Sequence, residues 1–151
     1  MRKLAICIGL YKLHLNLRPL LLLPRGKGEH IFLIDDEPVL LEIGKQMLEH
    51  LGYQVTIRTS SIEALGLFSS QPGPFHLVIT DMTMPNMTGE KLAREILRIR
   101  PGLPIILCTG FSEHVTEEKA KALGIREFLM KPLTLKDLAR AVRRNLAPLV
   151  D

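Results

Sequence analysis

The 151-residue chain is poor in cysteine and in aromatic side chains, and each shortage excludes a class of protein. Two cysteines, Cys7 and Cys108, are too few for a disulfide framework and lack the spacing of a metal-binding pair. Cys108 lies inside an apolar run, which is typical of a small core residue. We therefore expect a protein of a reducing compartment, and we place it in the cytoplasm.

The chain also lacks a basic surface in its main part, although its formal charge is +4. Residues 1–30 carry six Lys or Arg and one Glu, for a net charge of +5, whereas residues 31–151 have a net charge of −1. Aromatic residues make up only 5% of the chain. Without a basic stripe or many aromatic side chains, the globular part is not expected to bind nucleic acid directly.

No apolar stretch is long enough to cross a membrane without interruption. Leu4–Leu23 comes nearest, but Lys12, Arg18 and Pro19 break it. A central Lys or Arg costs roughly 2.5 to 3.5 kcal/mol on the lenient insertion scale, so we predict no membrane span.

The first 29 residues are otherwise weakly patterned. Apolar and polar residues alternate over Tyr11–Arg18 with the period of a half-buried strand, which leaves an added strand, a loosely held tail and a remnant of another domain as alternatives. Pro24–Gly28 has the composition of a linker. The sequence thus predicts an extension and linker over residues 1–29 and one domain over residues 30–149, a length that suits a single core.

From His30 onward, short apolar runs alternate five times with segments of helical periodicity. Strands are predicted at Ile31–Ile34, Gln54–Arg58, Leu77–Thr80, Pro104–Cys108 and Glu127–Met130. Helices are predicted from Pro38 to Leu51, from Ser60 to before Pro72, from Gly89 to Ile99, from Glu117 to Leu123 and from Leu135 to Leu146. This alternation predicts an α/β domain, a doubly wound five-stranded parallel sheet with helices on both faces.

Polar residues follow four of the five predicted strands. Asp35 and Asp36 follow the first strand, Asp81 the third, Thr109 the fourth and Lys131 the fifth. The carboxyl ends of parallel strands share one edge of the sheet, which is where such folds bind ligands. If the first and third strands are neighbours, three carboxylates crowd one site, and Mg²⁺ with retained waters relieves their repulsion. The hydroxyl and the ammonium then face an anion such as phosphate.

Each of these residues also has an ordinary structural reading. Asp35 and Asp36 favour a helix N-terminus by about 0.3 to 1 kcal/mol, and Asp81 alone is more often a loop or capping residue than a nucleophile. Thr109 beside a glycine suits a turn, and Lys131 suits a surface lysine. The functional hypothesis rests on the joint occurrence of all of them at the ends of parallel strands.

These residues belong to motifs that resemble the response-regulator receiver domain, the phosphoacceptor module of two-component signalling, over about residues 30–149. The motifs are Ile34–Glu37, Thr80–Pro85 with Gly89, Leu107–Gly110 and Phe128–Pro132. Their spacings of 45 residues from Asp36 to Asp81, 28 more to Thr109 and 22 more to Lys131 also fit. The resemblance implies the flavodoxin-like strand order 2-1-3-4-5.

The resemblance also assigns roles at the site. Asp81 is the expected phosphoacceptor, and Mg²⁺ is expected on Asp36, Asp81 and the backbone carbonyl of Thr83, with Asp35 acting through a water ligand of the ion. Lys131 is expected to neutralise the phosphoryl group, and the Lys131–Pro132 peptide bond is expected to be cis.

Two residues are expected to form the switch. The resemblance implies that Thr109 hydrogen-bonds the phosphoryl group once it is present, and that Phe128 turns into the space that Thr109 vacates. Because residue 128 is Phe and not Tyr, its two states would differ by packing alone, without a hydroxyl hydrogen bond.

The implied function is phosphorelay signal transduction, with a histidine kinase or phosphotransfer protein as donor and an unknown downstream protein as target. The family implies an interaction surface on the fourth helix, fifth strand and fifth helix, for a partner or a homodimer. We expect a switch and not an enzyme, beyond self-catalysed phosphorylation and dephosphorylation. With only Pro148–Asp151 after the last helix, a stand-alone receiver and one detached from a hybrid kinase both remain open.

Two other functions are open to such a site. A Mg²⁺-dependent phosphohydrolase would use Asp81 as a transient nucleophile, but Met82 and Thr83 supply no second carboxylate as general acid. A degenerate interaction module independent of phosphorylation is disfavoured because none of the acceptor-site residues is missing.

Overall fold

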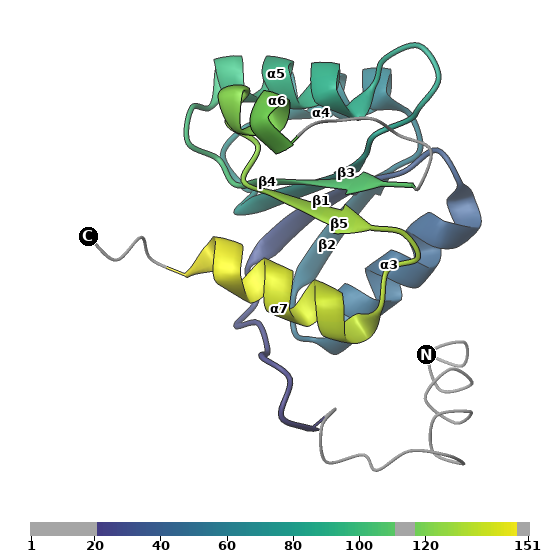
Figure 1. Cartoon of the computed structure of the whole chain (residues 1–151), viewed down its shortest axis with the longest axis vertical. Coiled ribbons are helices and arrows are strands. Elements are labelled where there is room, and N and C mark those ends of the chain that lie inside the picture. The colour runs from purple at the N-terminus through teal and green to yellow at the C-terminus, as the bar shows by residue number, and fades with distance from the viewer. Residues whose placement is uncertain (1–20, 111–116, 148–151) are drawn as a thin grey trace.

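The structure is a computed structural model that describes residues 21–110 and 117–147, in which a parallel sheet lies between two layers of helices (Figure 1). The strands are β1 (His30–Ile34), β2 (Gln54–Arg58), β3 (Leu77–Asp81), β4 (Ile105–Thr109) and β5 (Glu127–Met130). The helices are α3 (Pro38–His50), α4 (Ser61–Ser70), α5 (Gly89–Ile99), α6 (Glu117–Ala122) and α7 (Leu135–Leu146). The alternation predicted for Tyr11–Arg18 lies outside the described residues.

The sheet is parallel throughout, with the order β2-β1-β3-β4-β5, which confirms the predicted fold and strand order. All five residues of β3 and of β4 are buried, as expected of central strands covered on both faces. The carboxyl ends of β1, β3, β4 and β5 therefore share one edge of the sheet.

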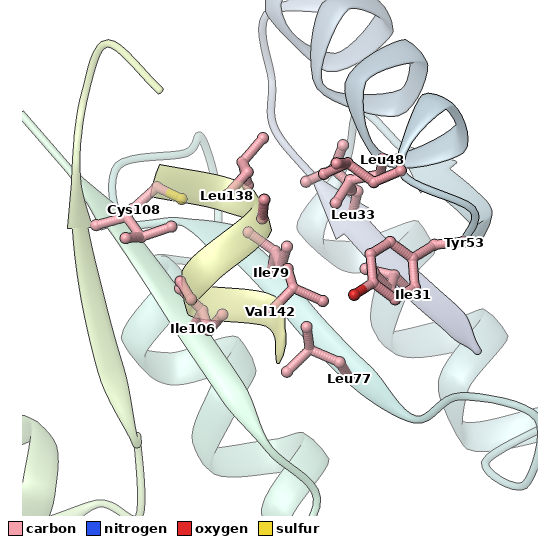
Figure 2. Packing of buried hydrophobic residues seen from close by; sticks show 14 of the residues in the cluster. Ile31, Leu33, Leu48, Tyr53, Leu77, Ile79, Ile106, Cys108, Leu138 and Val142 are labelled. Atoms are coloured by element: carbon pink, nitrogen blue, oxygen red, sulfur yellow. The ribbon is translucent and has the colours of Figure 1, made fainter. Parts of the chain in front are cut away.

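Each face of the sheet has its own apolar cluster, because successive strand residues point to opposite sides. Ile31 and Leu33 face α3 and α7, where they join Leu48 and Val142 in one cluster (Figure 2). Phe32 and Ile34 face the other way, into a second cluster with residues of α4, α5 and α6. These three helices lie together on that side of the sheet (Figure 1). Both layers are thus held by side chains that alternate along the same strands.

Helix starts follow the local sequence signals. The helix predicted from Ser60 has Ser60 as its N-cap, since the Ser60 side chain accepts a hydrogen bond from the Glu63 backbone N–H. Thr134 caps α7 in the same way through the Asp137 N–H. Thr88 caps α5, which the sequence reasoning did not predict. Among the described residues, no helix is long and apolar enough to cross a membrane.

At the opposite edge, where the strands begin, His30 lies in a small polar cluster. Its backbone N–H donates to Nδ1 of His76 at 2.9 Å, and its own Nε2 lies 2.7 Å from Oγ1 of Thr56. Its ring also packs against that of Phe75, with the centroids 4.9 Å apart. Burial, and then the charge of His76, lower the pKa of His30 from its ordinary value of 6.5.

This lowered pKa predicts an acid-sensitive fold. A histidine whose pKa is lower in the folded state contributes stability that is complete above pH 6.5 and is lost as the pH falls through the folded-state pKa. We expect the urea midpoint to fall between about pH 7 and about pH 5, and His30→Gln to reduce that fall. His50→Gln, at the end of α3, is the control, and equal pH slopes for the two variants would contradict the assignment.

Candidate functional site

Asp35 follows β1 directly and is held in place by hydrogen bonds from two sides. Its Oδ1 accepts from the Glu37 backbone N–H at 2.9 Å, within the short turn that leads into α3. Its Oδ2 accepts from Nζ of Lys131 at 2.9 Å. Pro38 then begins the helix, at a position where a missing N–H costs nothing. Both oxygens of this buried carboxylate are therefore engaged.

Asp81 is the last residue of β3 and lies at the centre of the edge. It pairs in register with Cys108 on β4, and only 7% of it is exposed. The chain then turns sharply, and the Gly89 N–H closes the turn by donating to the carbonyl of Met82 at 2.8 Å. A Cβ at residue 89 would lie 2.0 Å from the carbonyl oxygen of Asp81, so only glycine fits there.

Lys131 reaches the same edge from the end of β5. Its backbone N–H donates to the carbonyl of Thr109 at 2.8 Å, and its Nζ lies 2.9 Å from Oδ2 of Asp35 and 3.0 Å from Oδ1 of Asp81. Burial alone would lower the pKa of Lys131, but the two carboxylates outweigh it and raise that pKa. The side chain is therefore a fixed ammonium ion. The Lys131–Pro132 bond is cis, which confirms that expectation.

Asp35, Asp36 and Asp81 together form a cluster that can hold a cation. One carboxylate oxygen from each lies within 4.8 Å of the other two. Mg²⁺ has oxygen ligands at 2.0–2.1 Å, which places neighbouring ligands about 3 Å apart and opposite ligands about 4 Å apart. Three negative charges also exceed the single positive charge of Lys131. The donor set therefore fits one hard divalent ion.

The three other predicted site residues lie on the same edge or beside it. Thr109 ends β4 and is buried, with 8% of its surface exposed. Thr83 lies in the loop that follows Asp81. Phe128 on β5 is half-buried and packs against the apolar cluster under α4, α5 and α6. Their roles as hydroxyl donor, metal ligand and switch stay predictions.

A groove of about 520 Å³ opens beside Asp81 and Lys131, and the sequence reasoning did not predict it. One wall is α3, which contributes Leu40 and Ile43, and the floor includes Cys108. Leu40 and Ile43 recur at the helical spacing of an apolar face, but they are 42% and 40% exposed. The apolar face of α3 is wider than the part of the helix that packs on the sheet. Leu40 and Ile43, at the margin of that face, line the groove instead of packing in the core.

The close approach at Gly89 gives a testable prediction. Gly89→Ala must push the turn away from Asp81, which we expect to cost about 1 to 3 kcal/mol of stability and to displace Asp81. Gly66→Ala in α4 is the matched control, because a Cβ there meets nothing within 4 Å. Ala is the better helix former, so this control should gain about 0.5 to 1 kcal/mol. Urea denaturation measures both, and shifts of the same sign would contradict the geometry.

Comparison with known proteins assigns this chain to a family. The family model described as "Response regulator receiver domain" matches residues 31–143, which is most of the chain and includes every residue of the site. The chain belongs to the response-regulator receiver domain family. The two-component response regulator ORR25 of Oryza sativa subsp. japonica is 34% identical to this receiver over 112 residues, which are 74% of this chain and 16% of that protein. The receiver thus spans only a small part of that relative.

Solved structures agree with this assignment. The receiver superposes with a TM-score of 0.75 on a response regulator receiver domain protein from Clostridium thermocellum, at 36% identity, over 78% of this chain and 94% of that one. The receiver domain of the sensor histidine kinase PA1611 from Pseudomonas aeruginosa PAO1 gives a TM-score of 0.69 at 29% identity, over 79% of this chain and 98% of that one. That structure holds a magnesium ion in its active-site cleft.

Proposed function

We propose that this receiver accepts a phosphoryl group on Asp81 in a Mg²⁺-dependent reaction, and that the modified site switches a protein-interaction surface. The observation that carries the proposal is the meeting of Asp81, Lys131 and the acidic pair Asp35 and Asp36 at one edge, within hydrogen-bonding or metal-binding distance. These groups are what phosphoryl transfer needs, namely a nucleophile and opposite charges for the equatorial oxygens.

The proposed step is a displacement at phosphorus. A carboxylate oxygen of Asp81 attacks the phosphorus of a phosphohistidine, the P–N bond breaks, and its electron pair leaves with the imidazole ring of the donor. The product is an acyl phosphate on Asp81. Lys131 moves its ion pair from the carboxylate to the phosphoryl oxygens, and the Thr109 hydroxyl donates to one of them. Phe128 then turns toward the space that Thr109 leaves.

Asp36, Asp81 and the carbonyl of Thr83 would hold Mg²⁺, and Asp35 would contribute through a water ligand. Both oxygens of Asp35 already accept hydrogen bonds, from the Glu37 N–H and from Lys131, which supports this indirect role. When bound, the ion supplies positive charge to the oxygens of the transferring group.

The donor would be a histidine kinase or a phosphotransfer protein of the cytoplasm. Its phosphohistidine must reach Asp81, so its contact surface must cover the groove beside the site. Leu40 and Ile43 line this groove and are partly exposed, and Val39 on the same first turn of α3 is exposed, so α3 offers a donor an apolar surface. A downstream protein or a second copy would bind elsewhere, on α6, β5 and α7.

The test is the intact mass of the protein after incubation with acetyl phosphate and Mg²⁺, with and without a chelator. We expect a gain of one phosphoryl group that the chelator prevents. A gain that persists in chelator would remove the metal from the proposal, and no gain from either acetyl phosphate or a phosphohistidine donor would refute it. Steady release of phosphate from unrelated phosphate esters would favour the phosphohydrolase instead.

A further inference from the structure

The segment Leu23–Glu29, which precedes β1, is bound along the domain; we call it the strap. The match to the receiver family begins at Ile31, so the strap lies outside it. In Figure 1 the strap, the purple segment before β1, runs on the side of α3 and α7. Three kinds of contact hold it there: hydrogen bonds to backbone carbonyls, the packing of a buried leucine and a glycine, and an ion pair.

The hydrogen bonds cap the end of α3. The Gly26 N–H donates to the carbonyl of Leu51 at 2.7 Å, and the Arg25 guanidinium donates to the carbonyl of His50, also at 2.7 Å. The Gly28 N–H donates to the carbonyl of Gly52 at 2.9 Å. A helix leaves its last carbonyls without partners in the helix, and the strap supplies donors to them.

The strap also fits the apolar cluster between the sheet and the two helices. Leu23 belongs to that cluster and is only 9% exposed, whereas the adjacent Leu22 is 82% exposed. The backbone of Gly26 packs directly against the ring of Tyr53. A Cβ at this position would lie 2.4 Å from two ring carbons, so no larger residue fits without a shift. Figure 2 shows that ring in the same cluster as Ile31 and Leu48.

An ion pair ties the strap to the second helix of this layer. Oε2 of Glu29 lies 3.2 Å from Nη1 of Arg143 on α7. The Glu29 carbonyl also accepts from the Gln54 N–H at 3.0 Å, which joins the strap to β2. One segment of seven residues therefore contacts α3, β2 and α7.

We propose that the strap is a docked connector, so that the folded unit begins at Leu23 and the strap itself is fixed to α3 and α7. The boundary at residue 30 predicted from the sequence would then move by seven residues. A displacement of the strap would reach both helices, and α3 also lines the groove beside Asp81. This inference stands apart from phosphoryl acceptance, and either can fail without the other.

Limited trypsin digestion of the full chain tests the proposal through the Lys27–Gly28 bond inside the strap. Leu23→Ala removes the buried anchor, and Leu22→Ala removes an exposed neighbour of identical chemistry. We expect Leu23→Ala to speed cleavage of this bond by about tenfold or more relative to Leu22→Ala. Gly26→Val, which must displace the strap from Tyr53, should do the same. Cleavage after Arg98 on α5 is followed in the same digest.

A rise at Lys27 alone shows a strap that opens by itself, and an equal rise at Lys27 and Arg98 shows a strap that opens only with the whole domain. Either result supports docking. Hydrogen exchange gives an independent measure, since the Gly26 and Gly28 amides should be protected at least about tenfold in the unmodified chain. Equal cleavage in the Leu22 and Leu23 variants, with unprotected amides at both glycines, would overturn the proposal.

Discussion

Asp81→Asn is expected to abolish phosphoryl acceptance, so that acetyl phosphate and Mg²⁺ give no gain in mass. The amide has the same size as the carboxylate but is not a nucleophile and is a poorer metal ligand. The fold should survive, because Lys131 keeps its contact with Asp35 at 2.9 Å and the crowding of three carboxylates is relieved.

The control for this variant is Asp137→Asn, an exposed carboxylate in the first turn of α7. It should take up the phosphoryl group at the rate of the unmodified protein. Urea midpoints of both variants show whether the fold is kept. A gain in mass that persists in Asp81→Asn would mean that another residue is the acceptor, which would remove Asp81 from the proposed function.

Lys131→Met is expected to change two properties of the site in opposite directions. Phosphoryl acceptance should slow by about a hundredfold, which is typical of the loss of one preorganised donor to a developing charge. Mg²⁺ should bind more tightly, because the ammonium no longer competes for the oxygens of Asp35 and Asp81. Two unit charges about 4 Å apart repel by roughly 1 kcal/mol in water and about 4 kcal/mol near a protein surface, so we expect a gain of at least fivefold in affinity.

Calorimetric titration with Mg²⁺ and a time course of intact mass measure the two effects. Lys136→Met on the exposed side of α7 is the control and should change neither. This pairing of outcomes separates loss of charge from general damage to the fold, since damage would weaken Mg²⁺ binding as well. Weaker Mg²⁺ binding in Lys131→Met would therefore contradict the proposed electrostatics.

The order of elements followed from the sequence because each signal is local. Five short apolar runs alternate with helical periodicity, and capping residues such as Ser60 and Thr134 mark the helix starts. The site was predictable for a related reason. In a parallel sheet, residues just after the strands share one edge, so Asp35, Asp81 and Lys131 were expected to lie close together. The structure places Nζ of Lys131 2.9 Å from Oδ2 of Asp35 and 3.0 Å from Oδ1 of Asp81.

The sequence did not predict features that depend on which part of a helix or loop packs against the rest of the domain. Helical spacing marks Leu40 and Ile43 as apolar-face residues, but it does not say that the sheet ends before it reaches them. Pro24–Gly28 has the composition of a linker, and the backbone contacts of Gly26 leave no periodic signal. Gly89 belongs to one of the predicted motifs, but its close approach to Asp81 appears only in three dimensions.

Cys108 has a practical consequence of its own. It is a free cysteine in the floor of the groove, 3% exposed, and burial raises its pKa to about 12. At neutral pH the thiol is therefore protonated and inaccessible in the closed fold, so alkylating reagents should react with it only slowly. The rate at which such a reagent labels Cys108 therefore reports how often the end of β4 opens next to Asp81.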